Sequence, residues 1–88
     1  MIVDDELHVR EMLAEYLAGS YEVVCARNGL EALSLLAGRP IDLVISDISM
    51  DGMDGIELLS TVRRRHPGTK YALLTGHDIN HYIKADIN

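Results

Sequence analysis

Short apolar runs alternate with helical patterns along this chain of 88 residues. The apolar runs predict strands at residues 1–3, 21–26, 41–46 and 71–74. Strict alternation of strands and helices favours right-handed βαβ crossovers, which give a parallel sheet with helices on both faces. The sequence therefore predicts an α/β fold, a doubly wound parallel sheet, in one domain that spans residues 1–88.

A helix is predicted after each of these strands. In the first helix, apolar residues recur at the spacing of one helix face: Val9, Met12, Leu13, Tyr16 and Leu17. Asn28 is the expected N-cap of the second helix, with Glu31 in the position of its capping-box partner. Asp54 with Glu57 opens the third helix, and Asp78 is expected to cap the fourth.

The predicted sheet is short at its start and incomplete at the C-terminal end. The first strand has only residues 1–3 ahead of its acids, where about five or six residues are usual. The chain stops within or just after the fourth predicted helix. A strand at 71–74 that formed the sheet edge would leave backbone groups unpaired. We therefore expect the chain to form a homodimer or to exchange elements with a second copy.

Composition and charge narrow the classes of partner. The net charge of −6 disfavours direct binding to nucleic acid, because that affinity depends on Lys and Arg neutralising phosphates. The basic run at 63–65 is expected to compensate the dipole at the end of the third helix. No apolar stretch approaches the roughly 20 residues of a membrane span. The single cysteine, Cys25, is expected in the core and fits a reducing compartment, so cytoplasmic localisation is expected.

Carboxylates follow two of the predicted strands, at the point where each strand ends. Asp4 and Asp5 follow the first apolar run, and Asp47 follows the third. Ligands bind just beyond the carboxyl ends of strands in an open α/β sheet, so these side chains are expected to converge. Neighbouring carboxylates need a counter-charge, and Mg²⁺ suits oxygen ligands while leaving room for phosphate oxygens. The sequence therefore predicts a magnesium site.

Asp47 is the candidate nucleophile of this site. A metal that screens its negative charge allows a carboxylate to attack phosphorus and form an acyl phosphate. Thr75 follows the fourth apolar run, where its hydroxyl can hydrogen-bond an oxygen of the bound phosphoryl group. Gly76 has no Cβ, so the backbone can approach that group closely.

Motifs at the ends of three predicted strands occur in a fixed order: Asp4-Asp5-Glu6, then Asp47 with Met50 and Gly55, then Leu73-Leu74-Thr75-Gly76. Together, these motifs resemble the receiver domain of two-component response regulators, and the resemblance covers essentially the whole chain. It implies a flavodoxin-like doubly wound sheet. It also implies a cytoplasmic phosphoprotein that works in phosphorelay signal transduction.

The resemblance assigns a role to each candidate residue. Asp47 would accept a phosphoryl group from a sensor histidine kinase or a phosphotransfer protein. Asp4, Asp5 and Asp47 would hold Mg²⁺ together with the backbone carbonyl of Ser49, and Thr75 would be the switch hydroxyl. The domain would change conformation to control an output domain or downstream protein. It would not be a turnover enzyme.

The chain also departs from the family pattern. Receiver domains have a lysine at the end of a fifth strand, and Lys84 comes too soon after Thr75 to be that lysine. Asp51 replaces the family's proline, where it would either repel a phosphoryl group or face solvent. These departures leave open a pseudo-receiver, an interaction module that keeps the fold without phosphorylation.

Two other interpretations account for the acids without a receiver site. Asp47 and the acids at 4–5 would each serve as ordinary turn or cap residues, since Asp favours both settings. Alternatively, the segment 47–52 matches the first half of an EF-hand calcium loop. That loop requires Glu at its last position, which is Leu58 here, and a helix in place of the preceding β-branched run.

Overall fold

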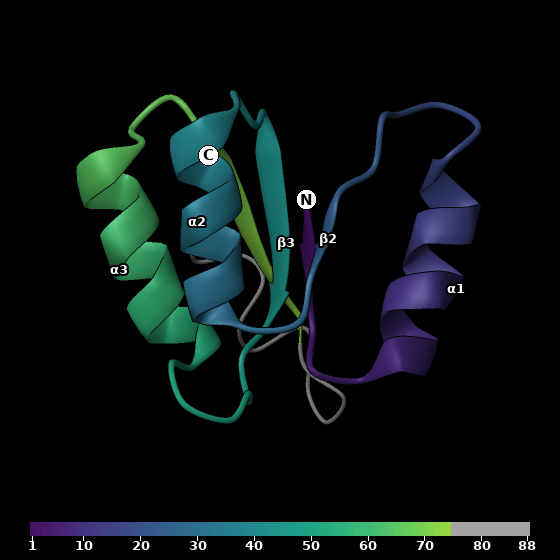
Figure 1. Ribbon diagram of the computed structural model, residues 1–88, viewed down its shortest axis with the longest axis horizontal. Coiled ribbons are helices and arrows are strands. Elements are labelled where there is room, and N and C mark those ends of the chain that lie inside the picture. The colour runs from purple at the N-terminus through teal and green to yellow at the C-terminus, as the bar shows by residue number, and fades with distance from the viewer. Residues whose placement is uncertain (75–88) are drawn as a thin grey trace.

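A parallel sheet of four strands organises the computed structural model, which describes residues 1–74. Its elements follow in the order β1 (Ile2–Val3), α1 (Leu7–Leu17), β2 (Cys25–Ala26), α2 (Gly29–Gly38), β3 (Leu43–Asp47), α3 (Gly55–Arg65) and β4 (Lys70–Leu74). The strands lie in the order β2-β1-β3-β4. Helices α2 and α3 cover one face of the sheet, and α1 lies on the other (Figure 1). The doubly wound α/β prediction is confirmed.

Predictions about the last part of the chain lie outside the described residues. They concern Thr75, Gly76, Lys84 and the helix expected after Asp78. Within the described part, β4 forms one edge of the sheet and β2 the other, as the strand order requires.

The core lies between the sheet and the pair α2 and α3. Side chains alternate across β3 and β4, so Val44 and Ser46 are buried on one strand while Tyr71 and Leu73 are buried on the next. Apolar residues of both helices pack against this face: Ala32, Leu36, Leu58, Leu59 and Val62. This packing fixes the positions of β3, β4 and the start of α3 relative to one another along the strand direction.

The caps of α2 and α3 were predicted correctly. The Asn28 side chain accepts a hydrogen bond from the backbone N–H of Glu31 at 2.8 Å, and Asp54 accepts one from Glu57 at 2.8 Å. The Glu31 carboxylate reaches back to the N–H of Arg27, one residue before the cap. Both helices therefore begin where their polar caps specify.

The first helix differs from the expected amphipathic pattern. No residue of α1 is buried, and Met12 and Tyr16 are 61% and 83% exposed. Among the described residues, α1 is the one helix on its face of the sheet (Figure 1). A cavity of about 500 Å³ lies beside it, lined mostly by apolar residues such as Ile2, Leu17 and Ile45, together with a few charged ones. The periodicity predicted the helix correctly, but its apolar face is only partly covered in residues 1–74.

The second strand is the least accurate of the strand predictions. Only Cys25 and Ala26 form β2, although the apolar run predicted a strand over 21–26. Ala26 is fully buried, whereas Cys25 is exposed, so the expectation of Cys25 in the core was wrong. Successive strand residues point to opposite faces, and Cys25 points to the less covered one.

Candidate functional site

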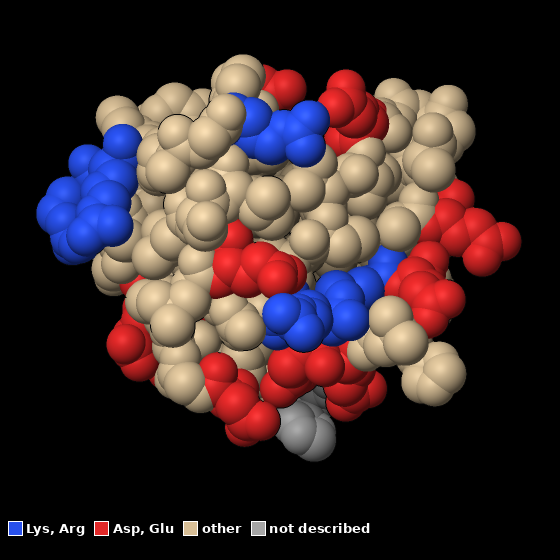
Figure 2. All heavy atoms as spheres, viewed as in Figure 1, with Lys and Arg blue, Asp and Glu red and all other residues tan. Residues whose placement is uncertain are grey.

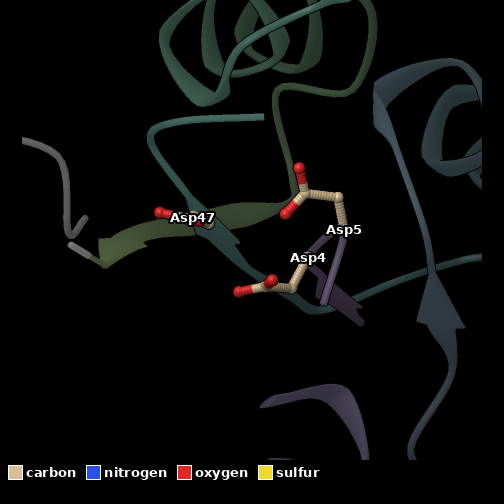
Figure 3. Close-up of side chains that lie close together, drawn as sticks. All are labelled: Asp4, Asp5 and Asp47. Atoms are coloured by element: carbon tan, nitrogen blue, oxygen red, sulfur yellow. The ribbon is translucent and has the colours of Figure 1, made fainter. Parts of the chain in front are cut away.

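The three acids predicted from the sequence lie together at the carboxyl ends of the strands. Asp4, Asp5 and Asp47 each offer a carboxylate oxygen, and these oxygens lie within 4.8 Å of one another. They project from the ends of β1 and β3 (Figure 3). Asp4 is buried, Asp47 is half-buried and Asp5 is exposed, so the group is open to solvent on one side.

Strand register produces this arrangement. In the parallel pair of β1 and β3, Val3 lies opposite Ser46, which brings Asp4 level with Asp47. The backbone N–H of Asp4 also donates to Ala26 of β2 at 3.1 Å. The three neighbouring strands therefore fix the height of Asp4 at the carboxyl edge, where α/β sheets bind their ligands.

Hydrogen bonds hold the backbone around Asp4. Its carboxylate accepts a bond from the N–H of Glu6 at 2.8 Å, which closes the turn into α1. The Arg10 guanidinium donates to the backbone carbonyl of Asp4 at 2.7 Å. Sequence reasoning missed Arg10, although its place in the first predicted helix, shortly after the acids, was an available signal.

Asp47 is held by its own neighbours in the chain. Its carboxylate accepts a bond of 3.3 Å from the backbone N–H of Ser49, and its carbonyl accepts one of 2.8 Å from the buried Ser46 hydroxyl. Ser49 itself is exposed at the start of the loop between β3 and α3. The predicted carbonyl ligand therefore belongs to a residue already bonded to Asp47.

The loop after Asp47 is closed by a glycine. The N–H of Gly55 donates to the carbonyl of Ile48 at 2.8 Å. A Cβ on Gly55 would collide with the backbone carbonyl oxygen of Asp47 and lie 2.9 Å from Cα of Ile48. Within the loop, Gly52 has a φ of 78°, a backbone conformation that favours glycine. Met50 is buried in the core while Asp51 faces solvent.

The electrostatics of the site favour a cation. Burial raises the pKa of the Asp4 carboxyl, and the charges of Asp47, Asp5 and Glu6 raise it further. The backbone hydrogen bond from Glu6 opposes this shift. Acidic side chains also gather along the lower rim in Figure 2, on the side where the strands end in Figure 1. Carboxylate oxygens that repel one another in this way are suitable ligands for Mg²⁺.

The calcium-loop interpretation does not fit this geometry. Asp47 is the last residue of a strand, so no helix precedes the loop as an EF-hand requires. The carboxylates grouped with Asp47 are Asp4 and Asp5, from another strand, rather than Asp51 of the same loop.

The family model of the response regulator receiver domain matches residues 1–88. The chain belongs to this family. Receiver domains are signalling domains of two-component systems, they typically bind Mg²⁺, and they interact with kinases and output domains. The acidic group at the carboxyl edge is thus the expected place for the magnesium of a receiver domain.

Curated relatives of the receiver domain include transcriptional regulators. The chain is 40% identical over 78 residues to the DNA-binding transcriptional regulator NtrC of Escherichia coli K12, covering 86% of this chain and 16% of NtrC. It is 38% identical over 78 residues to the response regulator protein FleR of Pseudomonas aeruginosa, covering 88% of this chain and 16% of FleR. The chain therefore spans about a sixth of the length of these relatives.

Solved receiver domains share the fold. The response regulator TrrA of Thermotoga maritima, solved in complex with Mg²⁺ and BeF, is 41% identical with a TM-score of 0.82, covering 92% of this chain and 70% of that one. A signal receiver domain from Pseudomonas fluorescens is 38% identical with a TM-score of 0.83, covering 89% of this chain and 64% of that one. These neighbours confirm the flavodoxin-like architecture that the sequence implied.

The basic run at 63–65 has the position predicted for it, at the end of α3. The basic patch at the far left of Figure 2 lies over the end of α3, whose last turn has Arg63, Arg64 and Arg65. Cations there are favourable next to the negative end of the helix dipole.

No helix within residues 1–74 has the length and apolar character needed to cross a membrane.

Proposed function

We propose that this receiver domain is a phosphoacceptor and that Asp47 receives the phosphoryl group from a sensor histidine kinase or a phosphotransfer protein. The observation that carries the proposal is the group of three carboxylates, whose oxygens lie within 4.8 Å of one another at the carboxyl edge of the sheet. Asp47 is the half-buried member, and its carboxylate accepts a hydrogen bond from the N–H of Ser49 in the loop that follows.

The proposed chemistry is a transfer between nitrogen and oxygen. A carboxylate oxygen of Asp47 attacks the phosphorus of a phosphohistidine and forms an acyl phosphate. The phosphorus–nitrogen bond breaks, and its electron pair stays on the imidazole nitrogen of the donor. Held by Asp4, Asp5, Asp47 and the Ser49 carbonyl, Mg²⁺ would supply the positive charge that makes this approach of two anions possible.

The response to phosphorylation is assigned to the segment after β4. The added charge would attract the hydroxyl of Thr75, and Gly76 would allow the backbone to approach the phosphoryl group. Such a switch is a change in order and packing driven by a local charge. The consequence would be control of an output domain or downstream protein within the cytoplasm.

Acetyl phosphate tests the proposal without knowledge of the kinase. With Mg²⁺ and labelled acetyl phosphate, the wild-type protein should incorporate label, and Asp47→Asn should lose it because an amide is not a nucleophile for phosphorus. Asp51→Asn is the matched control, since Asp51 is an exposed acid of the same loop outside the carboxylate group. Full labelling of Asp47→Asn would overturn the assignment.

The pseudo-receiver is the competing function, and Asp51 in place of the family's proline is the observation that favours it. Asp51 is exposed, however, and an acid in solvent repels a nearby anion only weakly. Its presence is therefore a weak argument for a pseudo-receiver. Calorimetric titration with Mg²⁺ separates the two functions. A phosphoacceptor requires binding that is lost on neutralising Asp4 or Asp47, whereas wild-type protein without magnesium binding would favour the pseudo-receiver.

A further inference from the structure

A buried tyrosine connects β4 to the start of α3. Tyr71 is 2% exposed, and its hydroxyl donates to the backbone carbonyl of Gly55 at 3.1 Å in the protein interior. In the sheet, Tyr71 lies opposite Val44, well before the end of β3. The side chain therefore reaches along the core toward the carboxyl edge, where Asp47 ends its strand.

Gly55 is in turn packed directly against the phosphoacceptor strand. Its N–H donates to the carbonyl of Ile48, and its Cα has no room for a Cβ because the backbone of Asp47 and Ile48 lies against it. A displacement of Gly55 would thus move the residue that follows Asp47.

β4 holds the loop at both ends. At the start of the loop, the N–H of Ile48 donates to the carbonyl of Leu74 at 3.0 Å. At the end of the loop, Gly55 accepts the hydroxyl of Tyr71. Ser49, the proposed carbonyl ligand of Mg²⁺, lies between these two attachments. The first attachment continues the sheet, whereas the second depends on one side-chain hydroxyl.

We propose that Tyr71 is a positioning residue of the phosphoacceptor site. Its hydroxyl fixes the loop between β3 and α3 so that the Ser49 carbonyl and the Asp47 carboxylate face the same ion. This inference rests on the proposed function, because the geometry that Tyr71 maintains is that of the magnesium ligands. Tyr71 acts through the backbone of Gly55 and contacts neither the ion nor the phosphoryl group.

Tyr71→Phe tests the proposal, since it removes the hydroxyl and keeps the ring in the core. Calorimetric titration with Mg²⁺ alone should show an affinity about two- to tenfold weaker, the range expected for the loss of one hydrogen bond. Labelling by acetyl phosphate should need more Mg²⁺ for half its maximal rate, while the rate at saturating Mg²⁺ stays near that of the wild type.

Thr69→Val is the matched control. The Thr69 hydroxyl donates to the carbonyl of Ile41 at 2.7 Å, so this variant also loses a bond from a side-chain hydroxyl to a backbone carbonyl. Thr69 precedes β4, at the end of the sheet opposite Asp47. Thermal unfolding should show comparable losses of stability in both variants, but Thr69→Val should bind Mg²⁺ like the wild type.

The outcomes distinguish this proposal from the proposed function. Equal magnesium affinities of Tyr71→Phe and wild type, or equal weakening in both variants, would overturn the positioning role and leave Asp47 as phosphoacceptor. A wild type that binds no Mg²⁺ and takes no label would overturn both.

Discussion

At the scale of single residues, the decisive feature is a carboxyl group buried beside other carboxyl groups. Asp4 is 7% exposed, and its pKa is raised first by burial and then by the charges of Asp47, Asp5 and Glu6. The folded state therefore retains a proton at pH values where the unfolded chain has lost it. Stability falls as pH rises from the ordinary carboxyl pKa through the raised pKa of the folded state.

Asp4→Asn should remove this loss of folding stability at higher pH. Without divalent cations, the variant should be more stable than the wild type at neutral pH, and the difference should disappear below the ordinary carboxyl pKa. The amide oxygen can still accept the hydrogen bond that Asp4 accepts from Glu6. Thermal unfolding across the pH range measures the effect, and an Asp4→Asn variant less stable than wild type at neutral pH would contradict it.

With Mg²⁺ bound, the wild type should be more stable than Asp4→Asn. At a Mg²⁺ concentration of one hundred times Kd, binding to the folded state should stabilise the wild type by about 2.7 kcal/mol. Asp4→Asn lacks a proposed ligand, so its unfolding midpoint should rise far less. Unfolding curves with Mg²⁺ and with EDTA measure both effects, and equal rises in the two proteins would count against Asp4 as a ligand.

At the scale of elements, the junction of β3 and α3 sets the position of Asp47. Asp54 caps the helix, Gly55 lies against the end of the strand, and Tyr71 holds Gly55 from β4. Sequence predicted the cap, because a cap is a local interaction with a known residue preference. It did not predict the bonds made by Tyr71 or Arg10, since each joins a side chain to a backbone carbonyl positioned by tertiary structure.

Gly55→Ala should distort this junction. The added methyl group would collide with the carbonyl of Asp47, so we expect a loss of stability of about 1–3 kcal/mol and weaker magnesium binding. Gly38→Ala, at the end of α2, is the control because no atom lies within 4 Å of its added Cβ. Chemical denaturation measures both variants, and equal stabilities would show that the close approach at Gly55 has no cost.

At the scale of the whole molecule, the alternation of strands and helices predicted the architecture more accurately than local residue patterns predicted the bounds of single strands. This alternation predicted the parallel sheet and the helices on both faces. The acids at the ends of β1 and β3 predicted the cluster of three carboxylates. The segment 21–26 was predicted too long, because strand propensity records side-chain preference and not which residues find a partner strand. Cys25 was misplaced for the same reason, since burial depends on what covers each face.

Self-association is the remaining prediction at this scale. In the described part of the chain, β4 is an edge strand and the face with α1 has a cavity lined mostly by apolar residues. Both features favour pairing with a second copy. Light scattering of the 88-residue chain should show a molar mass above that of a monomer that rises with concentration, and a constant monomer mass would contradict the expectation.

Locating the phosphoryl group tests the role of Asp47 as phosphoacceptor most directly. The protein is treated with acetyl phosphate with and without Mg²⁺, the acyl phosphate is trapped by borohydride reduction, and the modified residue is identified by mass spectrometry. We expect one modified residue, Asp47, formed only with Mg²⁺. Modification of Asp4, Asp5 or Asp51 instead, or modification of Asp47 to the same extent without divalent cations, would contradict it.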